Sequence, residues 1–193
     1  MASAITSTSY PVPTYPIRVH YIRSSTEVYS ASTADGLAWT EDAGVRLSSR
    51  TVPVLDIAVS SITGISILPL NAGGFRMLYS VIASTGAFRI YSATSADGLA
   101  WSNDTGTRIN VDDGLTFAGL PSLVELGTGD WRLYYIQNSI AGDQAANHQV
   151  FSSLSTNEGL NWSTGMVVIS TQAGQVAASR LTNASGRGPK ASS

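Results

Sequence analysis

Residues 29–47 read YSASTADGLAWTEDAGVRL, and residues 91–109 read YSATSADGLAWSNDTGTRI. The two stretches are identical at 12 of 19 positions, at an offset of 62 residues. A more diverged third copy begins at Phe151 and reads FSSLSTNEGLNWSTG. Such identity at a fixed spacing indicates an internal repeat, which predicts an architecture of similar modules that stack on one another.

Two further segments repeat upstream of these stretches. An arginine followed three residues later by a tyrosine occurs in IRVHY (17–21), FRMLY (75–79) and WRLYY (131–135). Before the second and third of these lie SILPLNAGGF, which starts at Ser66, and SLVELGTGDW, which starts at Ser122. The chain therefore contains about three copies of one unit of about 60 residues.

Each unit has the pattern of short β-strands. Runs rich in β-branched and aromatic residues, bounded by Gly, Asn, Asp and Ser, occupy 75–83, 88–94, 131–137 and 149–155. With the segment before the Arg-x-x-Tyr strand and a last strand near Arg46, Arg108 or Val167, a unit has four strands. Four antiparallel strands repeated at this length predict an all-β fold, a β-propeller of about three blades.

The repeat sets the expected domain boundaries and raises the question of ring closure. We expect a single propeller unit with a first blade at 10–50 that lacks its innermost strand, a second at 51–112 and a third at 113–170. Residues 171–186 resemble an innermost strand, and 187–193 form a tail. Since propellers need about four to eight blades, we expect homodimerisation to close a six-bladed ring, with 171–186 completing a blade of the partner. The alternative is that the chain is half of a longer propeller.

The turn after the third strand of each unit carries an acid or amide, a glycine and a tryptophan. These residues are Asp35, Gly36 and Trp39; Asp97, Gly98 and Trp101; and Asn157, Gly159 and Trp162. A side-chain oxygen can accept backbone N–H bonds across such a turn, and glycine can supply a positive φ. The pattern resembles the Asp-box (BNR) repeats of sialidase-like β-propellers and the S-x-D-G-x-x-W repeats of five-bladed glycoside hydrolases. Alignment on Gly and Trp places Ala34 and Ala96 where the longer Asp-box has its Asp.

The resemblance implies a structural role for these turns, on the rim away from the ligand funnel. Arg18, Arg76 and Arg132 invite comparison with the arginine cluster that binds a carboxylate in sialidases. Because a functional cluster converges from different positions in different blades, an arginine at the same position of every blade favours a tie between blades. An anion clamp is the alternative.

Composition excludes several classes of site. The 193 residues include no cysteine and two histidines, which excludes disulfides, thiol chemistry and a three-histidine metal centre, so no metal or other cofactor is expected. A net charge of −2 gives no basic field for nucleic acid. The apolar stretch 52–70 is interrupted by Asp56 and several hydroxyl residues, so no membrane span is expected. No signal peptide is visible; a soluble protein is expected, and an extracellular location stays open.

Carboxylates near the expected funnel are the candidates for catalysis. Asp56 lies on the connection into the second blade, Asp112 and Asp113 lie on the connection into the third, and Glu125 lies on its innermost strand. Two carboxyl groups about 5–5.5 Å apart suit a retaining glycosidase, and about 6.5–9.5 Å an inverting one. The alternatives are a solvated turn for Asp112 and Asp113 and a channel lining for Glu125.

Aromatic residues offer a binding interpretation. Trp131 and Tyr134, with Arg76 and Arg132, are candidate ligand-binding residues that could stack on and hydrogen-bond a glycan; a core position between blades is the alternative for Trp131. The similar repeats favour a non-catalytic, lectin-like propeller. The alternatives are a sialidase-like or other glycoside hydrolase, whole or fragment, and a structural propeller scaffold.

Overall fold

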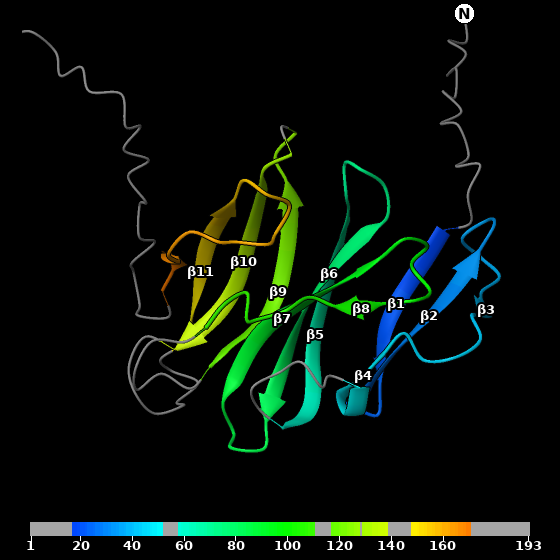
Figure 1. Ribbon diagram of the computed structural model, residues 1–193, viewed down its shortest axis with the longest axis horizontal. Helices are drawn as coiled ribbons and strands as arrows, with labels where there is room; N and C mark the ends of the chain where they lie inside the picture. The colour runs from blue at the N-terminus through cyan, green and yellow to red at the C-terminus, as the bar shows by residue number, and fades with distance from the viewer. Residues whose placement is uncertain (1–16, 52–57, 111–116, 128, 139–147, 171–193) are drawn as a thin grey trace, which may run out of the picture.

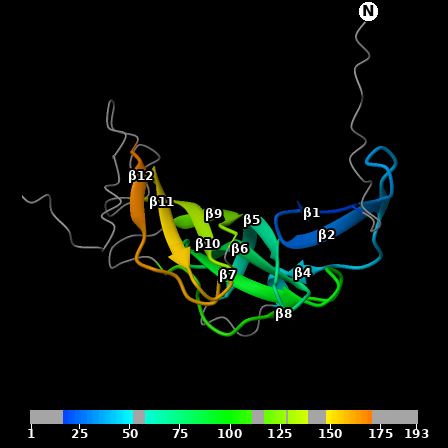
Figure 2. The ribbon, with the colours of Figure 1, turned by 90° about the horizontal axis from the view of Figure 1, so that it is seen from above.

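The computed structural model describes residues 17–51, 58–110, 117–127, 129–138 and 148–170, which form three antiparallel sheets. Apart from one 3-10 turn, η1 (Ser49–Thr51), every regular element in these ranges is a β-strand. The all-β prediction is confirmed. Figure 2 shows the three sheets following one another across the molecule in chain order, as blades of a propeller do.

No helix in the described part of the chain is long and apolar enough to cross a bilayer.

Blade 1 consists of β1 (Ile17–Arg23), β2 (Glu27–Thr33), β3 (Thr40–Glu41) and β4 (Leu47–Ser48). β2 pairs with β1 on one side and with both short strands, β3 and β4, on the other. Within the described ranges, no strand pairs with the other edge of β1. Among the described residues, this edge of β1 is therefore free, and we refer to it as the free edge of blade 1.

Blade 2 is complete. It consists of β5 (Val59–Pro69), β6 (Phe75–Ala83), β7 (Phe88–Ser95) and β8 (Ser102–Asn103), paired in that order (Figure 1). β6, the counterpart of β1, lies between two strands. A bridge between Ile90 and Ile109 continues the outermost strand, as β4 does in blade 1.

Blade 3 repeats this order with β9 (Ala118–Glu125), β10 (Trp131–Asn138), β11 (His148–Ser155) and β12 (Met166–Ile169). The strands predicted at 75–83, 88–94, 131–137 and 149–155 match β6, β7, β10 and β11 to within one residue at each end. Strong strand-forming runs between glycine-rich turns account for this agreement.

The innermost strands are longer than the sequence pattern indicated. The prediction placed a strand near Ser66, whereas β5 begins at Val59. Register shifts at Val59/Ser61 and at Ile62/Gly64 interrupt its pairing with β6. Because each bulge inserts an unpaired residue, the alternation of inward and outward side chains breaks, and the strand cannot be recognised by a period of two.

β5 and β9 lie side by side and run in the same direction (Figures 1 and 2). The Leu123 N–H donates to the Ser66 hydroxyl at 3.0 Å, and a methyl group on Gly64 would lie 3.2 Å from Leu120 Cα. Gly64 thus lies beside Leu120 and Ser66 beside Leu123, so residue numbers rise in the same direction along both strands and the strands are parallel. Glycine at position 64 permits this close approach, because any side chain would meet the backbone of β9.

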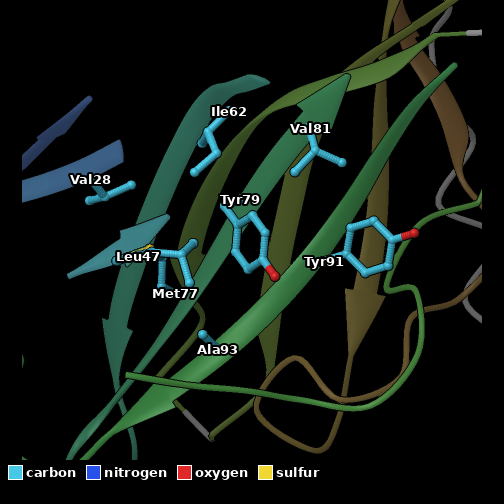
Figure 3. Close-up of a cluster of buried hydrophobic side chains, with 8 residues drawn as sticks. All are labelled: Val28, Leu47, Ile62, Met77, Tyr79, Val81, Tyr91 and Ala93. Carbon is cyan, nitrogen blue, oxygen red and sulfur yellow. The ribbon is translucent and has the colours of Figure 1, made fainter. Parts of the chain in front are cut away.

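Two apolar clusters hold the blades together. The first joins blades 1 and 2 and contains Val28, Leu47, Ile62, Met77, Tyr79, Val81, Tyr91 and Ala93 (Figure 3). The second joins blades 2 and 3 and contains Leu78, Ile90, Ile109, Ala118, Leu133 and Tyr135. Burying one such large side chain contributes about 1.5–3 kcal/mol relative to exposure. Stability thus comes from contacts between neighbouring blades as well as from pairing within each sheet.

Candidate functional site

The turn after the third strand of blade 1, turn 1 (residues 33–39), is organised by one carboxylate. Asp35 Oδ1 accepts the N–H groups of Leu37 at 2.8 Å and Ala38 at 3.1 Å. Gly36 has φ +79°, and its carbonyl accepts the indole N–H of Trp39 at 3.2 Å. The hydrogen bonds from Leu37 and Ala38 lower the pKa of Asp35. The ionised carboxylate is a structural part of the turn.

The equivalent turns of blades 2 and 3 have the same plan. In turn 2 (95–101), Asp97 Oδ1 accepts the N–H groups of Ala100 at 3.0 Å and Leu99 at 2.7 Å, and these hydrogen bonds lower the pKa of Asp97. In turn 3 (155–162), the Asn157 amide oxygen accepts the Asn161 N–H at 2.9 Å. The indole N–H of Trp101 donates to the Gly98 carbonyl, and that of Trp162 to the Gly159 carbonyl.

Arg18 links blade 1 to blade 2. Its Nε donates to Asp42 Oδ2 at 2.9 Å, within blade 1, and its Nη1 donates to the Asp97 carbonyl oxygen of turn 2 at 2.8 Å. The hydroxyls of Ser30 and Ser32 also donate to Asp42. Burial opposes ionisation of Asp42, but the hydrogen bonds from Ser30, Ser32 and Arg18 outweigh it and lower the pKa. Arg18 thus bridges a fixed carboxylate and the next blade.

Arg76 makes the same bridge one blade further on. Its Nε lies 3.2 Å from Asp104 Oδ2, and its Nη1 donates to the Glu158 carbonyl oxygen of turn 3. Ser92 and Thr94 hydroxyls donate to Asp104, as their counterparts do to Asp42. The buried Arg76 guanidinium binds protein oxygens of its own blade and of the next blade. This role in blade packing explains why the arginine recurs in the repeats, and no ligand is needed to explain it.

Arg132 has no such bridge in the described part of the chain. Its Nη1 donates to the Ser152 hydroxyl at 3.0 Å, and its side chain is half-buried. Gly165 stands three residues after Trp162, where Asp42 and Asp104 follow their own tryptophans. Tyr134 lies on the same face of β10 and is also half-buried.

Trp131 is a core residue, with 1% of its surface exposed. Its ring lies against turn 3, because a methyl group added at Gly159 would meet it at 3.0 Å. The indole of Trp162 lies 3.2 Å from the same point. The Trp131 ring therefore offers no free face on which a sugar could stack.

A second set of arginine contacts was missed by the sequence analysis. Arg46 Nη1 donates to the Leu99 carbonyl of turn 2 at 2.8 Å, and Arg108 Nη1 donates to the Leu160 carbonyl of turn 3 at 2.5 Å. Both arginines, like Asp42 and Asp104, are among the identical positions of the first two repeats. Identity beyond the turn motif was the signal that could have found them.

The structure describes only one of the candidate catalytic acids, Glu125. Asp56, Asp112 and Asp113 lie outside the described residues. Glu125 is the last residue of β9 and is exposed, at the end opposite the connections that carry these aspartates. The structure therefore does not bring Glu125 to the N-terminal ends of the innermost strands.

A groove of about 430 Å³ lies where blade 1 has its free edge. Arg18 and His20 of β1, residues 65–69 of β5, Phe75 and Gly98 line it. His20 Nε2 donates to the Gly98 carbonyl at 3.0 Å, and its ring meets Trp101 edge-on at 5.6 Å. Burial lowers the pKa of His20, and the charge of Arg18 acts in the same direction. The groove adjoins the edge of β1 that pairs with no described strand. Residues 171–186, which were predicted to supply a strand to a partner's first blade, lie outside the described part.

Comparisons with known proteins agree with this architecture. No protein-family model and no curated protein matches the sequence. The fold is similar to a thermostable family-43 glycoside hydrolase, with a TM-score of 0.61 and 15% identity over 75% of this chain and 45% of that chain. It is also similar to a GH43 β-xylosidase/α-arabinofuranosidase from a compost microbial metagenome, with a TM-score of 0.58 and 13% identity over 74% and 48%.

A third similar structure is the GH32 β-fructofuranosidase of Bombyx mori, with a TM-score of 0.55 and 14% identity over 80% of this chain and 34% of that chain. At these identities the likeness shows the fold. The chain folds as part of a β-propeller. It spans less than half the length of each of these three glycoside hydrolases.

Proposed function

We propose that this chain forms part of a carbohydrate-active β-propeller of the glycoside hydrolase type, with Asp-box turns on its rim. The similarity to three glycoside hydrolases supports the proposal, although fold and chemistry are separate properties. The observation that carries it is the parallel arrangement of β5 and β9. Candidate acids precede both of these innermost strands.

The parallel strands bring two connections to one end of the blade assembly. Asp56 lies three residues before β5, and Asp113 lies five residues before β9. Since β5 and β9 are neighbours and run in the same direction, both connections enter at the same end. Glycoside hydrolysis needs two carboxyl groups about 5–9.5 Å apart, one as general acid and the other as nucleophile or base. We propose Asp56 and Asp113 for these roles.

Two sequence features favoured a lectin-like function, the similarity of the repeats and the candidate sugar platform Trp131, and blade packing accounts for both. The residues shared by the first two repeats build turns 1 and 2 and the arginine bridges, so their near-identity follows from blade stacking. Trp131, a candidate sugar platform, is buried. These observations favour the hydrolase type over multivalent binding by the repeats.

Hydrolysis assays test the proposal. We expect turnover of aryl β-xylosides, aryl α-arabinofuranosides or sucrose, the substrate classes that the similar enzymes' names suggest. Asp56→Asn and Asp113→Asn should each lower kcat about a hundredfold or more, the usual contribution of general acid–base catalysis. Asp130→Asn is the matched control, because Asp130 lies in the turn between β9 and β10 at the other end of β9.

Binding measurements distinguish the hydrolase proposal from the lectin alternative. Saturable binding of a xylo- or arabino-oligosaccharide without turnover, and unchanged in Asp56→Asn and Asp113→Asn, would contradict the hydrolase proposal. The same result would support a non-catalytic carbohydrate-binding propeller.

A further inference from the structure

Each internal blade contact joins the Arg-x-x-Tyr strand of one blade to the turn of the next. Arg18 and His20, two residues apart on β1, reach the Asp97 and Gly98 carbonyls of turn 2. In blade 2, Arg76 reaches the Glu158 carbonyl of turn 3. The contact is directional, because the arginine always belongs to the earlier blade and the turn to the later one.

Blade 3 carries the arginine half of this contact, and no turn among the described residues receives it. Arg132 and Tyr134 occupy on β10 the positions of Arg18 and His20 on β1. Along β10 the burial alternates, so that Trp131, Leu133 and Tyr135 are buried while Arg132, Tyr134 and Ile136 are half-exposed. We name these three half-exposed residues the trailing face.

Strand β6 shows what both faces look like when they are covered. Every residue from Arg76 to Val81 is buried, because blades 1 and 3 pack on opposite sides of blade 2. The difference between β6 and β10 therefore marks the trailing face as a blade-packing surface that no described blade covers.

Turn 1 of blade 1 is the complementary half. Leu37 is 86% exposed and Trp39 is 42% exposed. Gly36 is exposed, with nothing within 4 Å of a methyl group added to it. Its counterparts Gly98 and Gly159 are buried. Among the described residues, no arginine reaches the carbonyls of turn 1.

The β-strand surface beside turn 1 is also uncovered. Ile17 and Val19 are exposed on β1, and Tyr21 stacks on Tyr29 with ring centroids 6.2 Å apart. Tyr79 and Tyr91 stack in blade 2 at the same 6.2 Å, and there Tyr79 is fully buried in the cluster shared with blade 1. We name Ile17, Val19 and Tyr21 the leading face. Its Tyr21 belongs to a stacked tyrosine pair whose counterpart in blade 2 is buried against blade 1, whereas in blade 1 the Arg23 guanidinium lies over the pair, 4.1 Å from the Tyr29 ring centroid.

We propose that the trailing face of one copy of this chain docks on the leading face and turn 1 of a second copy. Arg132 then donates to the Asp35 carbonyl of the second copy, as Arg18 does to Asp97, and Tyr134 lies beside Gly36 and Trp39. This contact is an interaction surface beyond the proposed function. Because each copy carries the two halves of the contact on opposite end blades, the association is head-to-tail, and two copies form two equal contacts.

A second copy fits better than an unrelated partner, because the chain itself carries the acceptor. Turn 1 has the same Asp, Gly and Trp as turn 2, which already receives Arg18 and Arg46. The cationic Arg132 meets carbonyl oxygens beside the Asp35 carboxylate, so the charges are complementary.

Sedimentation equilibrium tests the contact. We expect the full chain to associate into a species of twice its 20.2 kDa mass. Arg132→Glu on the trailing face should weaken association about tenfold or more, because it places a carboxylate against the backbone carbonyls of turn 1. Leu37→Arg on turn 1 should have a similar effect, because it places a second cation beside Arg132. Arg50→Glu, the same charge change at an exposed arginine of η1, should leave association unchanged.

An equimolar mixture of the two variants makes the test specific. The trailing face of the Leu37→Arg copy and turn 1 of the Arg132→Glu copy are both intact, so one of the two contacts is restored. We expect the mixture to associate more strongly than either variant alone. A monomeric wild-type chain, unweakened association of Arg132→Glu, or a mixture no stronger than its components would overturn the proposal.

Discussion

Arg18 and Arg76 make equivalent bridges in different surroundings. Each joins an aspartate of its own blade to a turn carbonyl of the next blade. The Arg18 side chain is 22% exposed and borders the groove beside the free edge of β1, whereas Arg76 is 7% exposed in the complete blade 2. The repeat thus fixes the geometry of the bridge, and completion of the blade determines how far it is removed from water.

Removing the two arginines should have the largest and most unequal effects. Arg76→Met leaves the carboxylate of Asp104 buried without its cation, which should lower the free energy of unfolding by about 3 kcal/mol. Asp42 is as buried as Asp104, at 14% and 15% exposed, but the Arg18 guanidinium borders the groove. Arg18→Met should therefore cost about 1 kcal/mol, because water can take the place of the guanidinium. Urea unfolding at one fixed protein concentration measures both. Equal losses would show that blade completeness does not control the strength of the bridge.

Glycine substitutions sharpen the comparison between covered and uncovered turns. Gly36 and Gly98 have φ +79° and +75°, so alanine at either position should cost about 1 kcal/mol of backbone strain. At Gly98 the added methyl group would also lie 3.1 Å from Arg18 Nη1, so Gly98→Ala should cost about 1 kcal/mol more than Gly36→Ala. Thermal unfolding of the two variants measures the difference. A larger loss of stability in Gly36→Ala than in Gly98→Ala would contradict the described packing of turn 2 against blade 1.

The smallest effect concerns His20, whose position in blade 2 is taken by Leu78. Burial lowers the pKa of His20 in the folded state below the value of about 6.5 of an unfolded chain. The unfolded state therefore binds more protons, so this contribution to stability is complete above about pH 6.5 and is lost as the pH falls towards the folded pKa.

His20→Leu, which copies blade 2, should flatten the pH dependence of the unfolding free energy just below pH 6.5. Urea unfolding between about pH 5 and 8 measures the slope. An unchanged slope in the variant would mean that His20 is not the group that titrates there.

Much of the fold could be predicted because the repeat carries it. Strong strand-forming runs located β6, β7, β10 and β11, and the Asp-Gly-x-x-Trp spacing located turns 1 and 2. β5 was placed too late along the chain because its bulges and Gly64 interrupt the alternation on which a strand prediction depends.

The site was less predictable than the fold. Periodicity and motifs report local backbone geometry, whereas the arginine bridges join residues far apart in sequence, such as Arg76 and Glu158. The burial of Trp131 likewise depends on turn 3, which the chain reaches only after the rest of β10 and the whole of β11. Asp56 and Asp113 were identified from chain order alone, and their roles stay proposals.

The direction of the arginine bridges has a consequence for synthesis on the ribosome. Arg18 obtains its second acceptor only when Asp97, 79 residues further along the chain, has been made. Blade 1 can therefore pair its strands early, but it is fastened only after most of blade 2 has emerged. Assembly should therefore proceed from the N-terminus to the C-terminus, and each blade becomes fixed only after the following blade has been synthesised.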